Sequence, residues 1–527
     1  MSTTAARGLA RAAAVIAVLT VLARLAGFAR TAVFGRSVGT GCVGSVYQTA
    51  NTIPNIVFDI VAGGMLSALV VPILAPVLAT GRRDDASRII SALLTWALIV
   101  LVPLAAIVAA LSGPIVRVLL GSGGCPGAVS LGTRMLAVFS VQIVFYGVGV
   151  VLAGALTAGE RFTWPALAPL LSSLAVIASY LWYGALAGTG RAAAGLPRSA
   201  EWVLTLGTTA GVLVLALCQL PAVWRTGVRW RPSLRFPAGV APTVRRAAMA
   251  GAFTLGAQQI AAAVMIRLAN SGSPVGTLVI VVLAQTVFLL PWAVLSLPVA
   301  TTSFPRLAAA WDAGERDDYR ARLAVASRVV IALAAGGSAL LVAVATPARV
   351  VLLGRHAQSV QQFAPAIATF AIGLLGWSVV ALLSRALYAA HAMGAAAAAQ
   401  VAGQVVVIIA DVVLSAALPA GQRAAALGLG NSIGVLVAGV LLVVVAVRHG
   451  ALRLPGVLKD AGPATAAAVV AAGAGWLVGK GTGHSGVLVA AGMGVLAAAT
   501  ATAVFLAVLL VLDRAAVRDL RARVIRR

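Results

Sequence analysis

The chain has 527 residues, of which 61% are hydrophobic and 10% are charged, and its mean hydropathy is +1.04. A soluble domain has no core large enough for so many apolar side chains, so the composition excludes a soluble protein and predicts an all-α, multi-pass membrane protein. The 39 basic residues outnumber the 13 acidic ones, but they stand between apolar runs and at the tail, so they do not indicate nucleic-acid binding.

Apolar runs follow one another along the chain, and most reach the ~20 residues that cross ~30 Å of hydrocarbon. The pattern predicts about fourteen transmembrane helices. The first run is too long for the core of a signal peptide and lacks a cleavage site, which favours a retained helix. The predicted spans are 9–36, 43–79, 89–111, 131–158, 164–188, 201–224, 243–270, 276–311, 324–346, 360–390, 395–418, 424–447, 462–479 and 485–512.

The loops between these runs alternate in charge. Three loops of one parity, and the tail, are rich in arginine, whereas loops of the other parity are short and rich in glycine, with only scattered charges. Arginine gathers on the cytoplasmic side of membrane proteins, so both termini are predicted to be cytoplasmic. The arginine-rich segments are 82–88, 225–246, 316–322 and 514–527.

The chain also repeats itself. The segment Pro72–Asp85 recurs as Pro305–Asp318, at an offset of 233 residues, and the same offset relates Gly121 to Gly354. After a two-residue slip, Ala155-Leu156 recurs as Ala386-Leu387. A repeat of about six helices with unchanged parity predicts two parallel lobes around a central cavity. The predicted domains are an N-terminal lobe (1–224), a basic cytoplasmic linker (225–242), a C-terminal lobe (243–447), a C-terminal helix pair (448–512) and a basic cytoplasmic tail (513–527).

The first span carries two arginines, Arg24 and Arg30, on either side of Gly27. An ionised group inside a span costs at least ~2.5 kcal/mol, so it needs a partner or a wet cavity. Two guanidinium forks suit a phosphate or pyrophosphate group, which predicts substrate binding by Arg24 and Arg30. The alternative for Arg30 is that its side chain reaches the outer interface.

The second span is interrupted by Pro54 and by Gly63-Gly64. Broken backbone at membrane depth is tolerated where protein or a cavity covers it, so this span is predicted to line the cavity. The eighth span has a comparable break at Pro291. We expect these residues, together with Gly27, to serve as hinges.

Asn55 and Asp59 lie between the two breaks of the second span. Both are predicted to line the substrate site. For Asp59 the sequence leaves two interpretations open, an ion pair with Arg24 or the binding of a coupling cation.

Other ionisable groups lie within spans. Arg134 and Arg267 stand near span ends, which favours side chains that reach the interface. Asp411 lies in the middle of an apolar run and is expected to pair within the second lobe.

Several sites are not indicated. Scattered histidines and the absence of a CxxC motif argue against a metal site, and no cofactor motif or catalytic constellation points to an enzyme. Cys42 and Cys125 both fall in outer loops, and the sequence leaves open whether they pair.

The residues 23–30, followed by Phe34-Gly35 and Val38-Gly39, resemble the first-helix signature of the MurJ/MviN family. Pro54-Asn55, Gly63-Gly64 and the segment 71–75 follow at that family's spacing. The turn 160–162 and the proline-containing eighth helix are similar to the family as well.

This resemblance implies a member of the multidrug/oligosaccharidyl-lipid/polysaccharide exporter (MOP) superfamily. It implies a flippase that moves lipid II, an undecaprenyl-pyrophosphate-linked peptidoglycan precursor, across a bacterial inner membrane by alternating access. Arg24 and Arg30 match the family's first-helix arginines. Expected partners are a lipid-linked anionic substrate, membrane lipids and cell-wall synthesis or division proteins.

The chain departs from the family at several polar positions. Ser45 and Phe58 stand where the family has an acid and an arginine, and Thr286 and Leu289 replace an arginine and a glutamate. The seventh helix keeps Gln259 and adds Arg267, and with Ser45 these two are weaker candidates for the substrate site. The losses keep two alternatives open, an exporter of another lipid-linked glycan or metabolite and a non-transporting scaffold for envelope synthesis.

Overall fold

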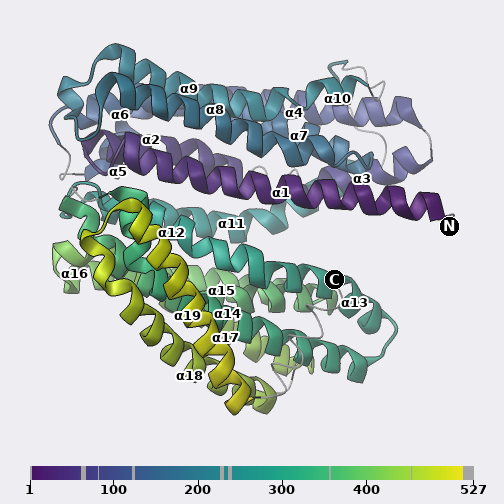
Figure 1. The fold of residues 1–527 in the computed structure, drawn as a ribbon. Helices are drawn as coiled ribbons and strands as arrows, with labels where there is room; N and C mark the ends of the chain where they lie inside the picture. The colour runs from purple at the N-terminus through teal and green to yellow at the C-terminus, as the bar shows by residue number, and fades with distance from the viewer. Residues whose placement is uncertain are drawn as a thin grey trace. The chain divides into compact units, whose positions relative to one another are not determined.

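A computed structural model describes residues 3–60, 67–80, 82–121, 125–225, 231–234, 240–354, 358–452 and 454–513 (Figure 1). All regular structure in these segments is helical, which confirms the predicted fold class. Helices satisfy their own backbone hydrogen bonds, as a chain in hydrocarbon must. The chain divides into two compact units, Met1–Gln259 and Ile260–Arg527.

The first unit contains long helices and short connecting ones. Helix α1 packs along α8, α4 packs on α7, and α2 packs on α6 and α7. The elements are α1 (Thr3–Ser37), α2 (Cys42–Phe58), α3 (Ser67–Ala79), α4 (Arg83–Ala110), α5 (Ser112–Leu120), α6 (Ala128–Phe139), α7 (Gln142–Ala158), α8 (Thr163–Ala187), η3 (Ala193–Gly195), α9 (Arg198–Leu217), α10 (Leu220–Trp224) and α11 (Val240–Asn270), which continues into the second unit.

The second unit is built around α14 and α15, with α17 between α15 and α16, and the final pair α18–α19 packs on α14. Its elements are α12 (Thr277–Pro291), the π-helix η4 (Trp292–Ser296), α13 (Leu297–Asp312), α14 (Arg316–Leu353), η5 (Gln358–Gln362), α15 (Phe363–Ala389), α16 (Met393–Ala417), η6 (Ala420–Gln422), α17 (Arg423–Arg448), α18 (Leu454–Gly479), η7 (Lys480–His484) and α19 (Val487–Leu512).

In the described segments, twelve helical stretches are long and apolar enough to cross a membrane, so the protein is a multi-pass membrane protein. Two of the fourteen predicted spans are not among them. Of the span 43–79 the structure describes α2 and α3, and the span 243–270 corresponds to α11, which has 31 residues.

The internal repeat reappears in the backbone of the turns. Gly39 and Gly272, related by the offset of 233, both have positive φ, at 81° and 62°. Glu160 and His391, related by the slipped offset, are the non-glycine residues with positive φ in the described chain, at 58° and 57°. Non-glycine residues seldom adopt this conformation, so a shared position indicates a shared turn structure.

Both units also have a π-helical turn near the predicted breaks, but α2 continues through Pro54, so the break predicted at that proline is not formed. In the first unit, α2 ends at Phe58 and a π turn follows at Asp59 and Ile60. In the second, α12 ends at Pro291 and η4 begins at Trp292, 233 residues after Asp59. Such turns are rare and often occur at functional sites. Gly63 and Gly64 lie outside the described residues, so the break they predict is not observed.

Close helix packing in the second unit depends on small residues. A Cβ atom on Gly376 of α15 would lie 2.8 Å from the backbone of Val435 and Leu436 in α17. A Cβ on Gly479 would lie 2.7 Å from the carbonyl oxygen of Ala343 in α14. Small residues let backbones approach in this way and gain packing contacts where lipid gives no hydrophobic advantage.

Candidate functional site

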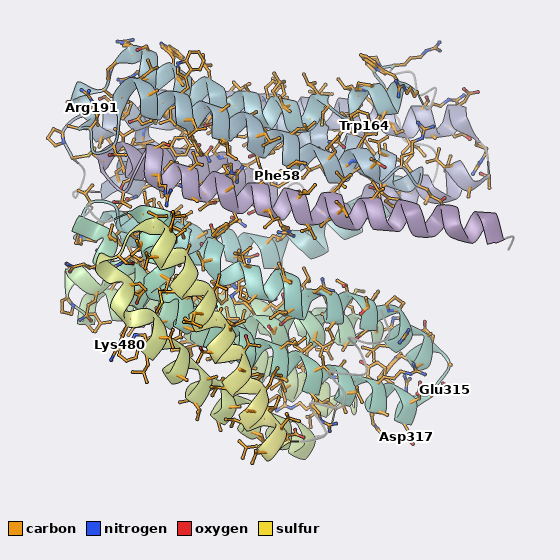
Figure 2. The ribbon with its side chains drawn as sticks, in the orientation of Figure 1. Phe58, Trp164, Arg191, Glu315, Asp317 and Lys480 are labelled. Atoms are coloured by element: carbon orange, nitrogen blue, oxygen red, sulfur yellow. A yellow bond between two sulfur atoms is a disulfide. The ribbon has the colours of Figure 1, made fainter. Side chains whose placement is uncertain are left out.

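Tyr146 of α7 brings part of the predicted site together. Its hydroxyl donates a hydrogen bond of 2.9 Å to Oδ1 of Asn55 in α2. Its ring packs on Phe58, with 4.5 Å between the centroids. Tyr146 also lies within electrostatic range of the Asp59 carboxylate. Figure 2 labels Phe58 at mid-length of the first unit, where these residues meet.

Arg30 of α1 adds positive charge to this region. Its guanidinium acts electrostatically on the phenol groups of Tyr146, Tyr47 and Tyr180. In the described part of the chain, no carboxylate forms an ion pair with Arg30. An unpaired guanidinium beside phenol and amide groups is suited to accept an anion.

The side chain of Gln259, the last residue of the first unit, lies near the carboxylate of Asp59. We call Arg30, Asn55, Asp59, Tyr146 and Gln259 the first-unit polar cluster. The ion pair between Asp59 and Arg24, one of two interpretations of the sequence, is not formed. Four of the five residues in this cluster were candidates from the sequence.

The other substrate-binding residues predicted from the sequence do not belong to this cluster. Arg24 is exposed and stands about 9 Å before Arg30 along α1. Ser45 is buried and lies about 15 Å before Asn55 along α2, and its hydroxyl has no hydrogen-bond partner in the segments that the structure describes. Arg267 belongs to the second unit, and its Nη1 is buried without a partner.

Arg134 does not simply extend to the interface, as the sequence analysis favoured. Its Nε and Nη2 each donate a 2.7 Å hydrogen bond to the Glu201 carboxylate in α9. Glu201 is 7% exposed, so this two-pronged pair neutralises a buried carboxylate. The prediction for Arg134 was wrong because its partner is 67 residues away in sequence and has no local signal.

The expected partner of Asp411 is also absent. Asp411 in α16 is 1% exposed, and its Oδ1 has no hydrogen-bond partner in the described chain. The facing position on α17 is Gly430, which packs against Asp411 and has no side chain with which to pair.

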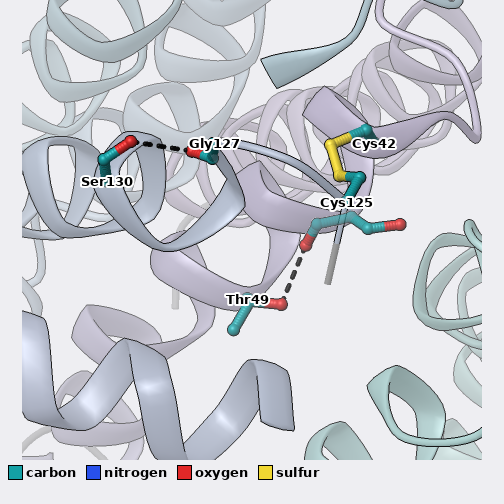
Figure 3. The surroundings of a disulfide bond; sticks show 6 residues. Cys42, Thr49, Cys125, Gly127 and Ser130 are labelled. Carbon is teal, nitrogen blue, oxygen red and sulfur yellow. Dashed lines mark hydrogen bonds between the residues drawn. A yellow bond between two sulfur atoms is a disulfide. The ribbon is translucent and has the colours of Figure 1, made fainter. Parts of the chain in front are cut away.

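A disulfide joins Cys42 at the start of α2 to Cys125 before α6 (Figure 3). Their Cα atoms are 6.2 Å apart, which is within the normal range for such a bridge. The residues around it are held locally, since Ser130 donates to the carbonyl of Gly127 at 3.0 Å. The structure thus pairs the two cysteines whose pairing the sequence left open.

The fold has known relatives. A solved structure described as lipid II flippase MurJ in an inward closed conformation matches with a TM-score of 0.70 at 16% identity, over 94% of this chain and 99% of that one. A solved multidrug resistance MATE family transporter of the MOP superfamily matches with a TM-score of 0.66 at 15% identity, over 83% and 98%. The chain therefore shares its fold with these two solved membrane proteins.

The sequence identifies the family. The family model for lipid II flippase MurJ matches residues 34–496. A curated lipid II flippase MurJ from Burkholderia cenocepacia is 26% identical over 391 residues, which are 72% of this chain and 73% of that protein. The chain belongs to the lipid II flippase MurJ family.

Tyr146 was not among the site residues predicted from the sequence. A tyrosine in the apolar run 131–158 is what ordinary packing between helices would also require, so the residue type alone does not indicate a site. One signal was available: the slipped repeat offset aligns Tyr146 with Trp377, so two large aromatic residues share a position in the repeat.

Proposed function

We propose that this protein moves lipid II from the inner to the outer leaflet of a bacterial inner membrane by alternating access. Its membership in the lipid II flippase MurJ family supports the substrate and the direction. The observation that carries the proposal is the first-unit polar cluster, because polar groups at membrane depth need a wet or substrate-filled environment.

In this proposal Arg24 and Arg30 bind the pyrophosphate of the substrate. Among the described residues neither has a carboxylate partner, so their donors are available to phosphate oxygens. Tyr146 holds the amide of Asn55 in one orientation through its hydrogen bond. Asp59 binds the coupling cation, with Gln259 near its carboxylate. A gradient or the membrane potential supplies the drive, at ~2.3 kcal/mol per charge and 100 mV.

The hinges of the motion are proposed at the helix breaks. Pro54 lies inside α2, which ends at the π turn of Asp59, and Pro291 with η4 interrupts the eighth span. Gly27 would allow α1 to bend between its two arginines; a Cβ there would meet no atom within 4 Å.

Both termini are proposed to be cytoplasmic, as the arginine-rich loops predict. The disulfide supports this orientation, because such bonds persist on the oxidising side of the membrane, where Cys42 and Cys125 would then lie. The protein performs transport rather than catalysis, and its proposed partners besides lipid are cell-wall synthesis or division proteins.

Transport of labelled lipid II into purified vesicles tests the assignment. The Arg24→Ala and Arg30→Ala variants should each reduce translocation by about tenfold, the loss expected for one charge-assisted contact. Arg191→Ala, an exposed arginine at the far end of the first unit, is the matched control and should transport normally. Unchanged translocation in both α1 variants would refute their roles.

A second candidate is an exporter of another lipid-linked glycan or metabolite. It is favoured by the positions at which the chain lacks charges of the family, Ser45, Phe58, Thr286 and Leu289. Rescue of a strain depleted of its lipid II flippase would favour the first function, and failure to rescue would favour the second. Rescue without any measurable translocation in vesicles would instead favour a scaffold.

A further inference from the structure

One cavity of the first unit lies away from the polar cluster. It has a volume of about 400 Å³ and is formed by the turn between α7 and α8 together with the end of α10. In Figure 2, Trp164 of this cavity and Arg191 lie at opposite ends of the first unit. The lining residues are Glu160, Arg161, Phe162, Thr163, Trp164, Ala222 and Arg225.

The turn between α7 and α8 holds Arg161 at the cavity. Glu160 takes a positive φ of 58°, and the next backbone N–H, of Arg161, bonds the carbonyl of Leu156 at 2.8 Å. Nη1 of Arg161 donates 3.3 Å to the carbonyl of Ala222, which fixes the guanidinium between the turn and α10. This contact uses one of its five N–H donors, and Arg225 brings a second guanidinium.

The cavity stands at the edge of the predicted membrane region. The span Ala128–Ala158 ends there, Thr163–Ala187 begins there, and Arg198–Trp224 ends there. Exposed aromatic residues flank it, with Phe162 at 41% and Trp224 at 68% exposure. Aromatic side chains favour this depth, where lipid headgroups meet the hydrocarbon.

We propose that this cavity binds the phosphate headgroup of an anionic membrane lipid, with Arg161 and Arg225 as its ligands. Two guanidiniums against the one carboxylate of Glu160 leave a net positive charge, and phosphate is the anion that forked donors match best. The cavity is open to the interface, so a lipid reaches it without crossing the helix bundle. This site is separate from the first-unit polar cluster and does not depend on its cargo.

The second unit supplies an internal comparison. At the equivalent turn, His391, Ala392 and Met393 replace Glu160, Arg161 and Phe162. The turn keeps its form, since the N–H of Ala392 bonds the carbonyl of Leu387 at 2.8 Å. Its polar contact is instead a pair of His391 with Asp312 at 3.2 Å. The arginine is therefore not needed to make the turn.

The experiment measures lipid retention by the purified full chain in nanodiscs of phosphatidylcholine with added phosphatidylglycerol, using native mass spectrometry. The wild type should prefer phosphatidylglycerol, and Arg161→Gln with Arg225→Gln should weaken that preference about tenfold. Arg191→Gln is the control, because Arg191 is also exposed and also bonds a backbone carbonyl, that of Ala187 at 2.8 Å. An unchanged preference in the double variant would overturn the proposal.

A second variant guards against simple misfolding. Glu160→Asn removes the carboxylate at a position where asparagine tolerates the positive φ, so it should tighten phosphatidylglycerol binding. Weaker binding in this variant would contradict the assigned charge balance. In detergent, inorganic phosphate is the second probe. Displacement of the lipid by millimolar phosphate would assign the site to a free anion and overturn the lipid assignment, whereas retention supports it.

Discussion

The two units place different chemistry on the same backbone positions. The repeat offsets relate Asn55 to Phe288, Asp59 to Trp292, and Tyr146 to Trp377. In the first unit these positions form a hydrogen-bonded polar cluster, whereas in the second the rings of Trp292 and Trp377 pack with centroids 5.9 Å apart. Both units share the π turn and the helix order, so these features are part of the common fold. Only the first unit has polar residues at these positions, so we assign the polar residues to the functional site.

The units also differ in how their helices are held together. The first has the disulfide, the ion pair of Arg134 with Glu201, and buried hydroxyls, such as Tyr47 bonded to Tyr180 at 2.7 Å. The second also has a buried hydroxyl bond, from Tyr319 to the carbonyl of Ala386 at 2.8 Å, and glycines bring the backbones of α15, α16 and α17 into close contact. Substitutions at the disulfide, at the ion pair and at the glycine contacts should therefore lower the free energy of unfolding by different amounts, which can be measured on variants.

Loss of the disulfide should have the largest effect on stability. Replacing both Cys42 and Cys125 with serine removes a cross-link over 83 residues and should lower the free energy of unfolding by about 3 kcal/mol. Thermal unfolding in detergent, with and without a reductant, measures this. Cys218→Ser, the free thiol of the same unit, is the control and should change little. Equal midpoints for the double variant and the wild type would show that the bridge does not hold the unit.

Removal of the Arg134 charge should come next. Arg134→Met leaves the Glu201 carboxylate buried without its partner, at a cost of about 2–3 kcal/mol. Partial rescue by Glu201→Gln in the same chain, read from the unfolding midpoint, would confirm that the cost comes from the carboxylate. A double variant as unstable as the single one would argue for lost packing instead.

Glycine packing gives the third prediction, this time in the second unit. Gly376→Ala places a methyl group 2.8 Å from the backbone of α17 and should destabilise by about 2 kcal/mol. Gly473→Ala in α18, where a Cβ meets no atom within 4 Å, should be neutral or slightly stabilising. The unfolding midpoints of the two variants, measured side by side, test this prediction. Equal midpoints for Gly376→Ala and Gly473→Ala would contradict the packing argument.

The smallest effect in free energy concerns transport rather than folding. Asp59→Asn should reduce lipid II translocation about tenfold, equal to ~1.4 kcal/mol, with normal unfolding behaviour. Trp292→Phe, at the repeat-related position, should translocate normally. Equal losses in the two variants would remove the functional asymmetry between the units.

The sequence predicted the helices, the repeat and the break at Pro291, because hydropathy and proline positions are local signals. The break predicted at Pro54 is not formed, since α2 continues through that residue. The sequence also selected Arg30, Asn55, Asp59 and Gln259, since each is polar within an apolar run. It did not predict which of them meet, nor that Tyr146 joins them, because tertiary contacts between helices have no local signature. The same reason explains the two wrong predictions. Arg134 pairs with Glu201, which is distant in sequence, and Asp411 faces a glycine of α17 that has no side chain to pair with it.

The disulfide also has a consequence for the biogenesis of the protein. Helices α2, α3, α4 and α5 lie between its two cysteines, so the thiols meet only after this part of the chain has been inserted and folded back. Maturation of the first unit is thus tied to a thiol oxidant in the compartment that receives these loops. A cell lacking such an oxidant would carry the reduced form, and its supply of working protein would follow the redox state of the envelope.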